Sequence, residues 1–244
     1  MCEPNGRLNP APKEISKTMS AAGHNSSLGW SASGRTIVFL LAATSIGSLL
    51  AEFYGLLSMR AFVGWVFLPA LAVLVGLGAF DRLRGDGRLF ANLVIGAVSG
   101  LLAAGAYDLC RLPFVFAEPW GIDAVVPPLD LLKVFPMFGA MIGGEPLEPG
   151  AYSVTAHLLG WLYHFSNGMT FGIMYLALIG DGARRHWLWA VLLAGGLEVG
   201  MLLTPYPTTF GIDVTPTFVA VTLAAHGIFG VALGLSVRVL ARRR

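Results

Sequence analysis

The sequence has little charge for its length. Only 12% of its 244 residues are Asp, Glu, Lys or Arg, about half the share found in soluble domains. In addition, 55% of the residues are hydrophobic and the mean hydropathy is +0.70, so the chain has more apolar surface than a soluble fold can bury. The composition therefore predicts an integral membrane protein, with the lipid bilayer as its first partner.

Local motifs for metal or redox chemistry are also missing. Cys2 and Cys110 lie far apart, without CxxC spacing or histidine partners, and no HExxH sequence occurs. The 16 basic residues are scattered among apolar stretches, so no basic face follows a phosphate backbone. We therefore expect no disulfide framework, no cysteine metal site and no nucleic-acid partner.

Long apolar runs are the main feature that is present. Residues 1–34 are polar and aperiodic, which predicts a disordered cytoplasmic tail, and residues 35–244 form the predicted transmembrane domain. Each run is close to the ~20 residues that a helix needs to cross ~30 Å of hydrocarbon. The expected fold is all-α, a polytopic bundle of about six spans. These spans are 36–57, 61–80, 90–112, 154–180, 186–204 and 216–240, with an outer loop at 113–152.

The basic residues predict the orientation of this bundle, because Lys and Arg near span ends accumulate in the cytoplasm. With six spans, thirteen of the sixteen basic residues fall on the side of both termini. The N- and C-termini are therefore expected in the cytoplasm, and the compact helices with short turns favour a bacterial inner (plasma) membrane. Residues 129–144 are apolar but contain Lys133 and Pro136, and a crossing there would reverse this orientation. We interpret them as an interfacial or re-entrant segment.

Glycine recurs at every fourth position in several spans, which lets helix backbones approach closely in lipid. The pairs are Gly96 and Gly100, Gly168 and Gly172, Gly196 and Gly200, and Gly230 and Gly234. His164 and His226 each precede such a pair by one turn. Either an internal repeat or chance on glycine-rich helices explains this shared pattern.

Ionisable residues occur in the outer half of the predicted spans. They are His164, Glu198 and His226, with Asp108, Glu52 and His157 nearer the outer surface. At ~1.5 Å per residue, both His164 and His226 lie about 15 Å from the outer ends of their spans. Such groups are costly in lipid and mark functional sites by default.

Structural roles account for part of this set. Asp108 and Arg111 are three residues apart and can pair on one helix. Glu52 and His157 are close enough to the surface to be solvated or to cap a helix end. The predicted site therefore depends on His164, Glu198 and His226.

Three functions are consistent with those residues. They form an outward-facing site for a cation, a proton or a transition metal in transport or sensing. Alternatively, His164 and His226 are the axial ligands of a b-type haem. In the third interpretation the polar residues only join helices, and the chain is an accessory subunit with a membrane protein partner or a homo-oligomer.

A fourth interpretation is an intramembrane serine hydrolase, with Ser166 as nucleophile and His226 as base. The stretch AHGIFGVALG, residues 225–234, resembles the last helix of rhomboid proteases, which also have six spans and a cytoplasmic N-terminus. The resemblance covers ten residues. Ser166 lies in HFSNG rather than in the GxSG turn of rhomboids, and the second span lacks their histidine and asparagine. We therefore do not assign the chain to that family.

Overall fold

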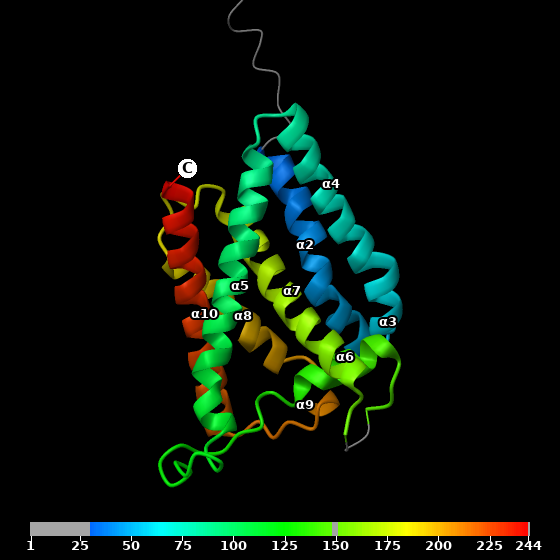
Figure 1. Ribbon diagram of the computed structural model, residues 1–244, viewed down its shortest axis with the longest axis vertical. Helices are drawn as coiled ribbons and strands as arrows, with labels where there is room; N and C mark the ends of the chain where they lie inside the picture. The colour runs from blue at the N-terminus through cyan, green and yellow to red at the C-terminus, as the bar shows by residue number, and fades with distance from the viewer. Residues whose placement is uncertain (1–29, 148–150, 244) are drawn as a thin grey trace, which may run out of the picture.

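The computed structural model describes residues 30–147 and 151–243, which form helices joined by loops, with no strand among them (Figure 1). This confirms the predicted all-α class. Most of the predicted tail, residues 1–29, lies outside the described part of the chain. Its last residues, 32–34, belong to the first described helix.

Ten helical elements follow one another along the described residues. They are α2 (Ala32–Phe53), α3 (Met59–Phe62), the π-helical turn η1 (Val63–Phe67), α4 (Leu68–Arg84), α5 (Arg88–Val115), α6 (Val134–Gly143), α7 (Val154–Ile179), α8 (Leu188–Leu202), α9 (Tyr206–Thr209) and α10 (Pro216–Arg242). Four helices are long and apolar enough to cross a membrane, namely α2, the continuous segment Met59–Arg84, α5 and α10. They support an integral membrane protein. Helices α7 and α8 are not among these four. The continuous, 26-residue α7 contains polar side chains such as His164 and Asn167, and α8 has only 15 residues.

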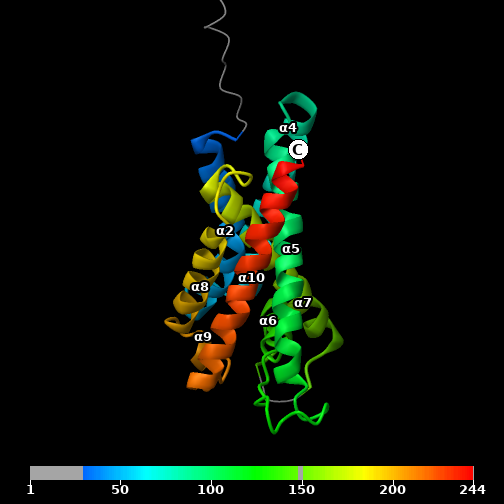
Figure 2. The ribbon, with the colours of Figure 1, turned by 90° about the vertical axis from the view of Figure 1, so that its left-hand side faces the viewer.

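The long helices run along one axis of the molecule. The start of α2, the end of α10, and the turns α4–α5 and α7–α8 lie at one end, which we call the termini end (Figures 1 and 2). The segments α6 and α9 and the loop that follows α5 lie at the opposite end, the loop end. Helix α7 packs against α2, α5 and α6, and α10 packs against α5 and α8. This arrangement places α7 at the centre of the bundle.

Side-chain caps begin the helices that enter from loops. Hydroxyls of Ser31, Ser153 and Thr215 accept hydrogen bonds from backbone N–H groups in the first turns of α2, α7 and α10. Pro216 follows Thr215 at the first helical position, where its missing N–H has no intrahelical partner to lose. Gly180 ends α7 with φ +74°, a conformation that residues with a Cβ rarely adopt.

Glycine contacts between α5 and α7 confirm the predicted packing. A Cβ on Gly100 would overlap the Gly168 carbonyl, and one on Gly172 would overlap the Gly96 carbonyl. The two backbones therefore touch along this seam, which no larger residue permits. In the same way, Gly139 of α6 lies against the backbone of α7.

A second seam joins α10 to α8. A Cβ on Gly230 would lie 2.5 Å from the Cα of Val191, and one on Gly234 would lie 2.6 Å from the Trp187 carbonyl oxygen. The remaining predicted pair behaves differently, because Gly196 and Gly200 are exposed and have nothing within 4 Å of a Cβ position. The four-residue spacing of Gly196 and Gly200 therefore does not mean that their face of α8 packs against another described helix of this chain.

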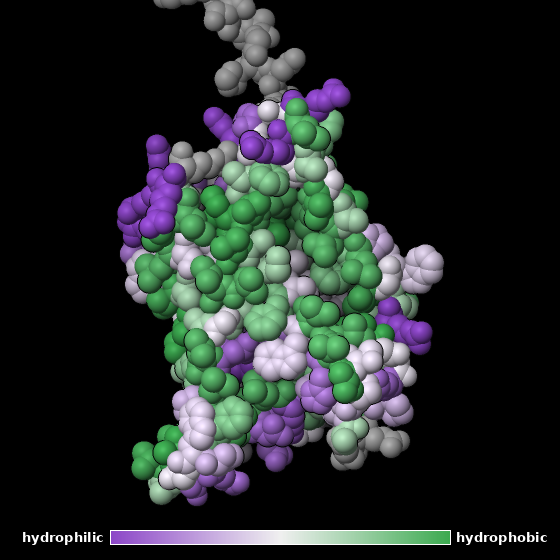
Figure 3. Space-filling view, viewed as in Figure 1, coloured by the Kyte–Doolittle hydropathy of each residue, from purple (hydrophilic) through white to green (hydrophobic). Residues whose placement is uncertain are grey.

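The surface of the bundle is apolar around its middle. In Figure 3, hydrophobic side chains cover the central part of the visible face and hydrophilic ones gather toward its two ends. Large hydrophobic side chains such as Leu40 and Leu102 are exposed on the described helices. A lipid bilayer satisfies such a surface, whereas water does not.

Candidate functional site

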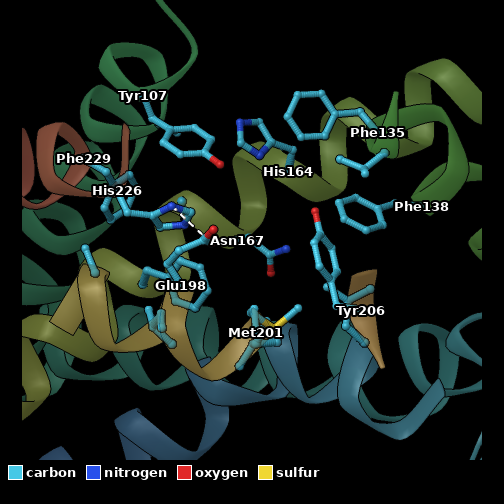
Figure 4. Close-up of a pocket in the computed structure, with 18 of the residues that line it drawn as sticks. Tyr107, Phe135, Phe138, His164, Asn167, Glu198, Met201, Tyr206, His226 and Phe229 are labelled. Atoms are coloured by element: carbon cyan, nitrogen blue, oxygen red, sulfur yellow. Dashed lines mark ion pairs between the residues drawn. The ribbon is translucent and has the colours of Figure 1, made fainter. Parts of the chain in front are cut away.

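A cavity of about 130 Å³ lies inside the bundle, lined by residues of α2, α5, α6, α7, α8, α9 and α10 (Figure 4). Its wall combines apolar and aromatic side chains with a set of polar ones. The polar members are Tyr107, Arg111, His164, Asn167, Glu198, Tyr206 and His226. All three residues of the predicted site therefore line one cavity.

The structure sorts the predicted residues into two histidine–carboxylate pairs. His226 Nδ1 lies 3.3 Å from Glu198 Oε2 and 2.9 Å from the Thr222 carbonyl oxygen. His164 Nε2 lies 2.9 Å from Asp108 Oδ2. One pair joins α10 to α8, and the other joins α7 to α5.

The glycine seams explain why each histidine meets a carboxylate. His164 precedes Gly168 by one turn on α7, and Gly168 holds α7 against α5, which carries Asp108. His226 precedes Gly230 on α10 in the same way, and α10 packs closely on α8, which carries Glu198. The close approach of the backbones leaves a short gap for the polar side chains to bridge. The His–Gly–Gly pattern therefore has the same structural role on α7 and α10: the glycines bring the neighbouring helix close, and the histidine contacts a carboxylate of that helix.

Arg111 anchors the first pair. Its Nη2 lies 2.7 Å from Asp108 Oδ1, which confirms the expected pairing of these residues along α5. Nη1 donates to the Leu131 carbonyl at 3.1 Å and to the Tyr107 hydroxyl at 3.3 Å. The guanidinium also lies over the rings of Tyr107 and Phe135, 4.1 and 5.1 Å from their centroids. Asp108 and Arg111 thus offset each other's charge in a buried setting.

Glu198 has no such compensation. It is 6% exposed, and its only hydrogen-bonding or ionic partner among the described residues is His226. No Lys or Arg of the described chain forms an ion pair with it. Because no Lys or Arg of the described chain pairs with it, we call Glu198 the unbalanced acid of the cavity.

Asn167 is a site residue that our sequence analysis did not select. Its side chain is 8% exposed and lines the cavity, and its Oδ1 has no hydrogen-bond partner in the described part of the chain. In Figure 4 its amide lies between Glu198 and Tyr206. The signal was present in the sequence, because Asn167 is a polar residue one turn after His164 in a predicted span.

A second cavity, of about 300 Å³, lies next to the first, beneath the loops at the loop end. We call it the vestibule. Charged residues Asp130, Lys133 and Asp213 line it, and Lys133 Nζ donates to the Gly211 carbonyl at 3.0 Å. The residues common to both cavities are Tyr107, Arg111, Val134, Glu198 and Tyr206. Glu198 therefore lies at the boundary between the inner cavity and the vestibule.

The aromatic segment α6 forms one wall of the site. Phe135 stacks on the His164 ring at a centroid distance of 4.2 Å. Gly139 of α6 and Gly160 of α7 permit this contact, because a Cβ on either would overlap the backbone of the other segment. The segment expected to be interfacial or re-entrant is thus part of the cavity wall.

Two of the predicted peripheral residues do not take part. The Glu52 carboxylate accepts a hydrogen bond from the Met59 backbone N–H at the turn between α2 and α3, and His157 is exposed near the start of α7. Neither lines the cavity. Their positions agree with the structural roles expected for them.

The hydrolase pair is not brought together. The Ser166 hydroxyl donates to the Tyr163 carbonyl at 2.8 Å, within its own helix. No hydrogen bond joins Ser166 to His226 among the described residues, and Ser166 does not line the cavity. The geometry lacks the contact between nucleophile and base that this chemistry requires.

Metal and haem binding fit the cavity poorly. Within residues 30–147 and 151–243, no group of three or more His, Cys, Asp or Glu side chains is placed to hold a metal ion. For haem, a porphyrin would have to lie between the two imidazoles. That space holds the Tyr107 ring, whose centroid lies 6.1 Å from that of His164 and 4.9 Å from that of His226.

Comparisons of the chain with protein-family models, with curated proteins and with solved structures gave no match. Its function is therefore inferred from the chemistry of the cavity.

Proposed function

We propose that this membrane protein binds a cation or a proton at the buried Glu198–His226 pair and exchanges it with the outer side, as membrane transporters do. The observation that carries the proposal is the unbalanced Glu198 carboxylate. It faces the inner cavity and the vestibule and has only His226 as a partner among the described residues.

The pair is suited to reversible occupancy. With neutral His226, an ionised Glu198 leaves the cavity one negative charge, which a single proton or monovalent cation neutralises. The other charged groups around the pair do not supply that charge, because Arg111 is already offset by Asp108. His164 is held by Asp108 in turn. Intramembrane acids with a histidine partner serve proton and ion pathways for this reason.

The proposed orientation follows from the two ends of the bundle. Nine of the twelve basic residues in the described part of the chain lie in segments at the termini end, so that end would face the cytoplasm in a six-span, N-in and C-in topology. Helices α7 and α8 would be the additional crossings. The vestibule at the loop end would then open to the outside of a bacterial inner membrane.

Infrared difference spectroscopy on the lipid-reconstituted protein tests this function without knowledge of a ligand. Between alkaline and acidic buffer, the wild type should show the carbonyl band of a newly protonated buried carboxyl group. Glu198→Gln should abolish that band, whereas the matched control Glu118→Gln, at an exposed loop position, should retain it. A band that persists unchanged in Glu198→Gln would refute the proposed function.

An assembly role is a second candidate, favoured by the open glycine face of α8. Gly196 and Gly200 have nothing within 4 Å of a Cβ position in this chain, so a helix from another protein or a second copy can approach there. In this case, the purified protein should form a larger complex by light scattering, and Gly200→Leu should dissociate it. If the wild type is monomeric and shows the infrared band that Glu198→Gln abolishes, only the cation or proton site is left as a candidate function.

A further inference from the structure

The ligand class of the inner cavity follows from its wall. The aromatic side chains that line it are Tyr107, Phe135, Phe138, Phe171, Tyr206 and Phe229. Arg111 already lies over the first two rings, and four aromatic side chains remain. Aromatic faces attract organic cations, whereas a hard metal ion requires several oxygen ligands in place of its water.

Glu198 and Asn167 both line this space. Glu198 supplies a carboxylate, and Asn167 carries a buried amide oxygen that has no donor in the described part of the chain. An unsatisfied buried acceptor is costly, so Asn167 Oδ1 calls for an N–H or O–H group. A carboxylate and an amide oxygen beside aromatic walls match a protonated amine, which brings both positive charge and N–H donors.

Size sets the upper limit for this ligand. The cavity volume of about 130 Å³ is close to the ~150 Å³ of an engineered protein cavity that takes up benzene. The apolar part of the amine therefore has to be short. Larger polar molecules would have to extend past Glu198 into the vestibule.

We infer that the inner cavity binds a small primary alkylammonium ion, with its charged end at Glu198 and Asn167 and its alkyl part among the aromatic rings. This inference rests on the proposed function, because it uses the cation position at Glu198. It adds the chemical class of the ligand and a role for Asn167.

Calorimetric titration of the detergent-purified protein with isobutylammonium chloride tests the inference. Isobutanol, a neutral compound of nearly the same shape, and potassium chloride serve as controls. Isobutylammonium should bind at least about tenfold more tightly than isobutanol, since the charge-assisted hydrogen bonds supply more than ~1.4 kcal/mol. Potassium chloride should give no saturable heat.

Variants separate the role of Asn167 from folding. Asn167→Leu, which removes the acceptor at similar size, should weaken isobutylammonium binding by about tenfold or more. The matched control Asn92→Leu, on α5 outside both cavities, should leave it unchanged. If Asn167→Leu does not fold, the affinities of the wild type for isobutylammonium and isobutanol still decide whether the cavity prefers an ammonium ion.

The outcomes distinguish this inference from the proposed function. Equal affinity for isobutylammonium and isobutanol, or no binding of either, would overturn the ammonium ligand. If the wild type in that case still shows the infrared band that Glu198→Gln abolishes, the proton site remains without an ammonium ligand. If that band is also missing, both proposals fail.

Discussion

Removing the charge of Asp108 should destabilise the bundle more than any surface charge change. Asp108 is the only carboxylate that pairs with Arg111 in the described structure, at 2.7 Å, and it also accepts from His164 at 2.9 Å. In Asp108→Asn the guanidinium stays buried without a counter-charge. The neutral amide retains an acceptor but has only one oxygen for two donors.

The magnitude follows from the burial of the pair. The side chains of Arg111 and Asp108 are 4% and 14% exposed, so solvent screens their interaction little. Breaking a buried ion pair by removing one partner costs about 3–5 kcal/mol. Because asparagine retains one hydrogen bond, we expect about 3 kcal/mol for Asp108→Asn. Arg111→Met should cost a similar amount, and the double variant should cost about 2–3 kcal/mol less than the two single values together.

Equilibrium unfolding in mixed micelles of mild and denaturing detergent, followed by tryptophan fluorescence, measures these free energies. Asp181→Asn is the matched control. Asp181 pairs with Arg184 at 3.4 Å, but these side chains are 54% and 89% exposed. Screened surface pairs contribute under ~1 kcal/mol, and the control should change the free energy of unfolding by less than that.

A small effect would refute this reasoning. If Asp108→Asn costs no more than Asp181→Asn, Asp108 does not compensate the charge of Arg111. Additive costs in the double variant would lead to the same conclusion. In that case, Glu198 would no longer be the only unbalanced charge in the cavity.

Three further predictions concern packing, topology and chemistry. Gly100→Ala should destabilise the fold by about 1–3 kcal/mol because the α5–α7 backbones must separate, whereas Gly105→Ala, with open space at its Cβ position, should change unfolding by less than about 0.5 kcal/mol. In a chain whose native cysteines are replaced by serine, an impermeant maleimide should label Glu118→Cys on intact cells and Arg184→Cys only after permeabilisation; the reverse pattern would overturn the proposed orientation. A serine-reactive fluorophosphonate should not label the wild type, because the Ser166 hydroxyl donates to the Tyr163 carbonyl and bonds no histidine among the described residues; labelling that Ser166→Ala abolishes would restore the hydrolase interpretation.

Local patterns were sufficient to locate most helices. Predicted spans 90–112, 154–180 and 216–240 correspond to α5 (Arg88–Val115), α7 (Val154–Ile179) and α10 (Pro216–Arg242). Apolar length and the flanking caps and glycines determine such boundaries, and both are read from adjacent residues. The first span was placed several residues too late, because polar residues 32–34 begin α2.

The composition of the candidate site was partly accessible in the same way. An ionisable side chain at mid-span depth is costly wherever its helix packs, so His164, Glu198 and His226 stood out without any partner in view. Asn167 carries no charge and was not selected. Ser166 was the nucleophile only in the alternative hydrolase interpretation, and its hydroxyl donates to the backbone of its own helix.

The sequence by itself determined the all-α class and the close packing of most glycine faces, and it predicted an integral membrane protein, because each of these depends on the chemistry of neighbouring residues. Tertiary structure alone decided which groups meet. His164 and Asp108 are 56 residues apart, and the partner of each histidine depends on which helix its glycine seam contacts. The cavity and the unpartnered oxygen of Asn167 arise from several helices at once, and no local pattern records how those helices are placed together.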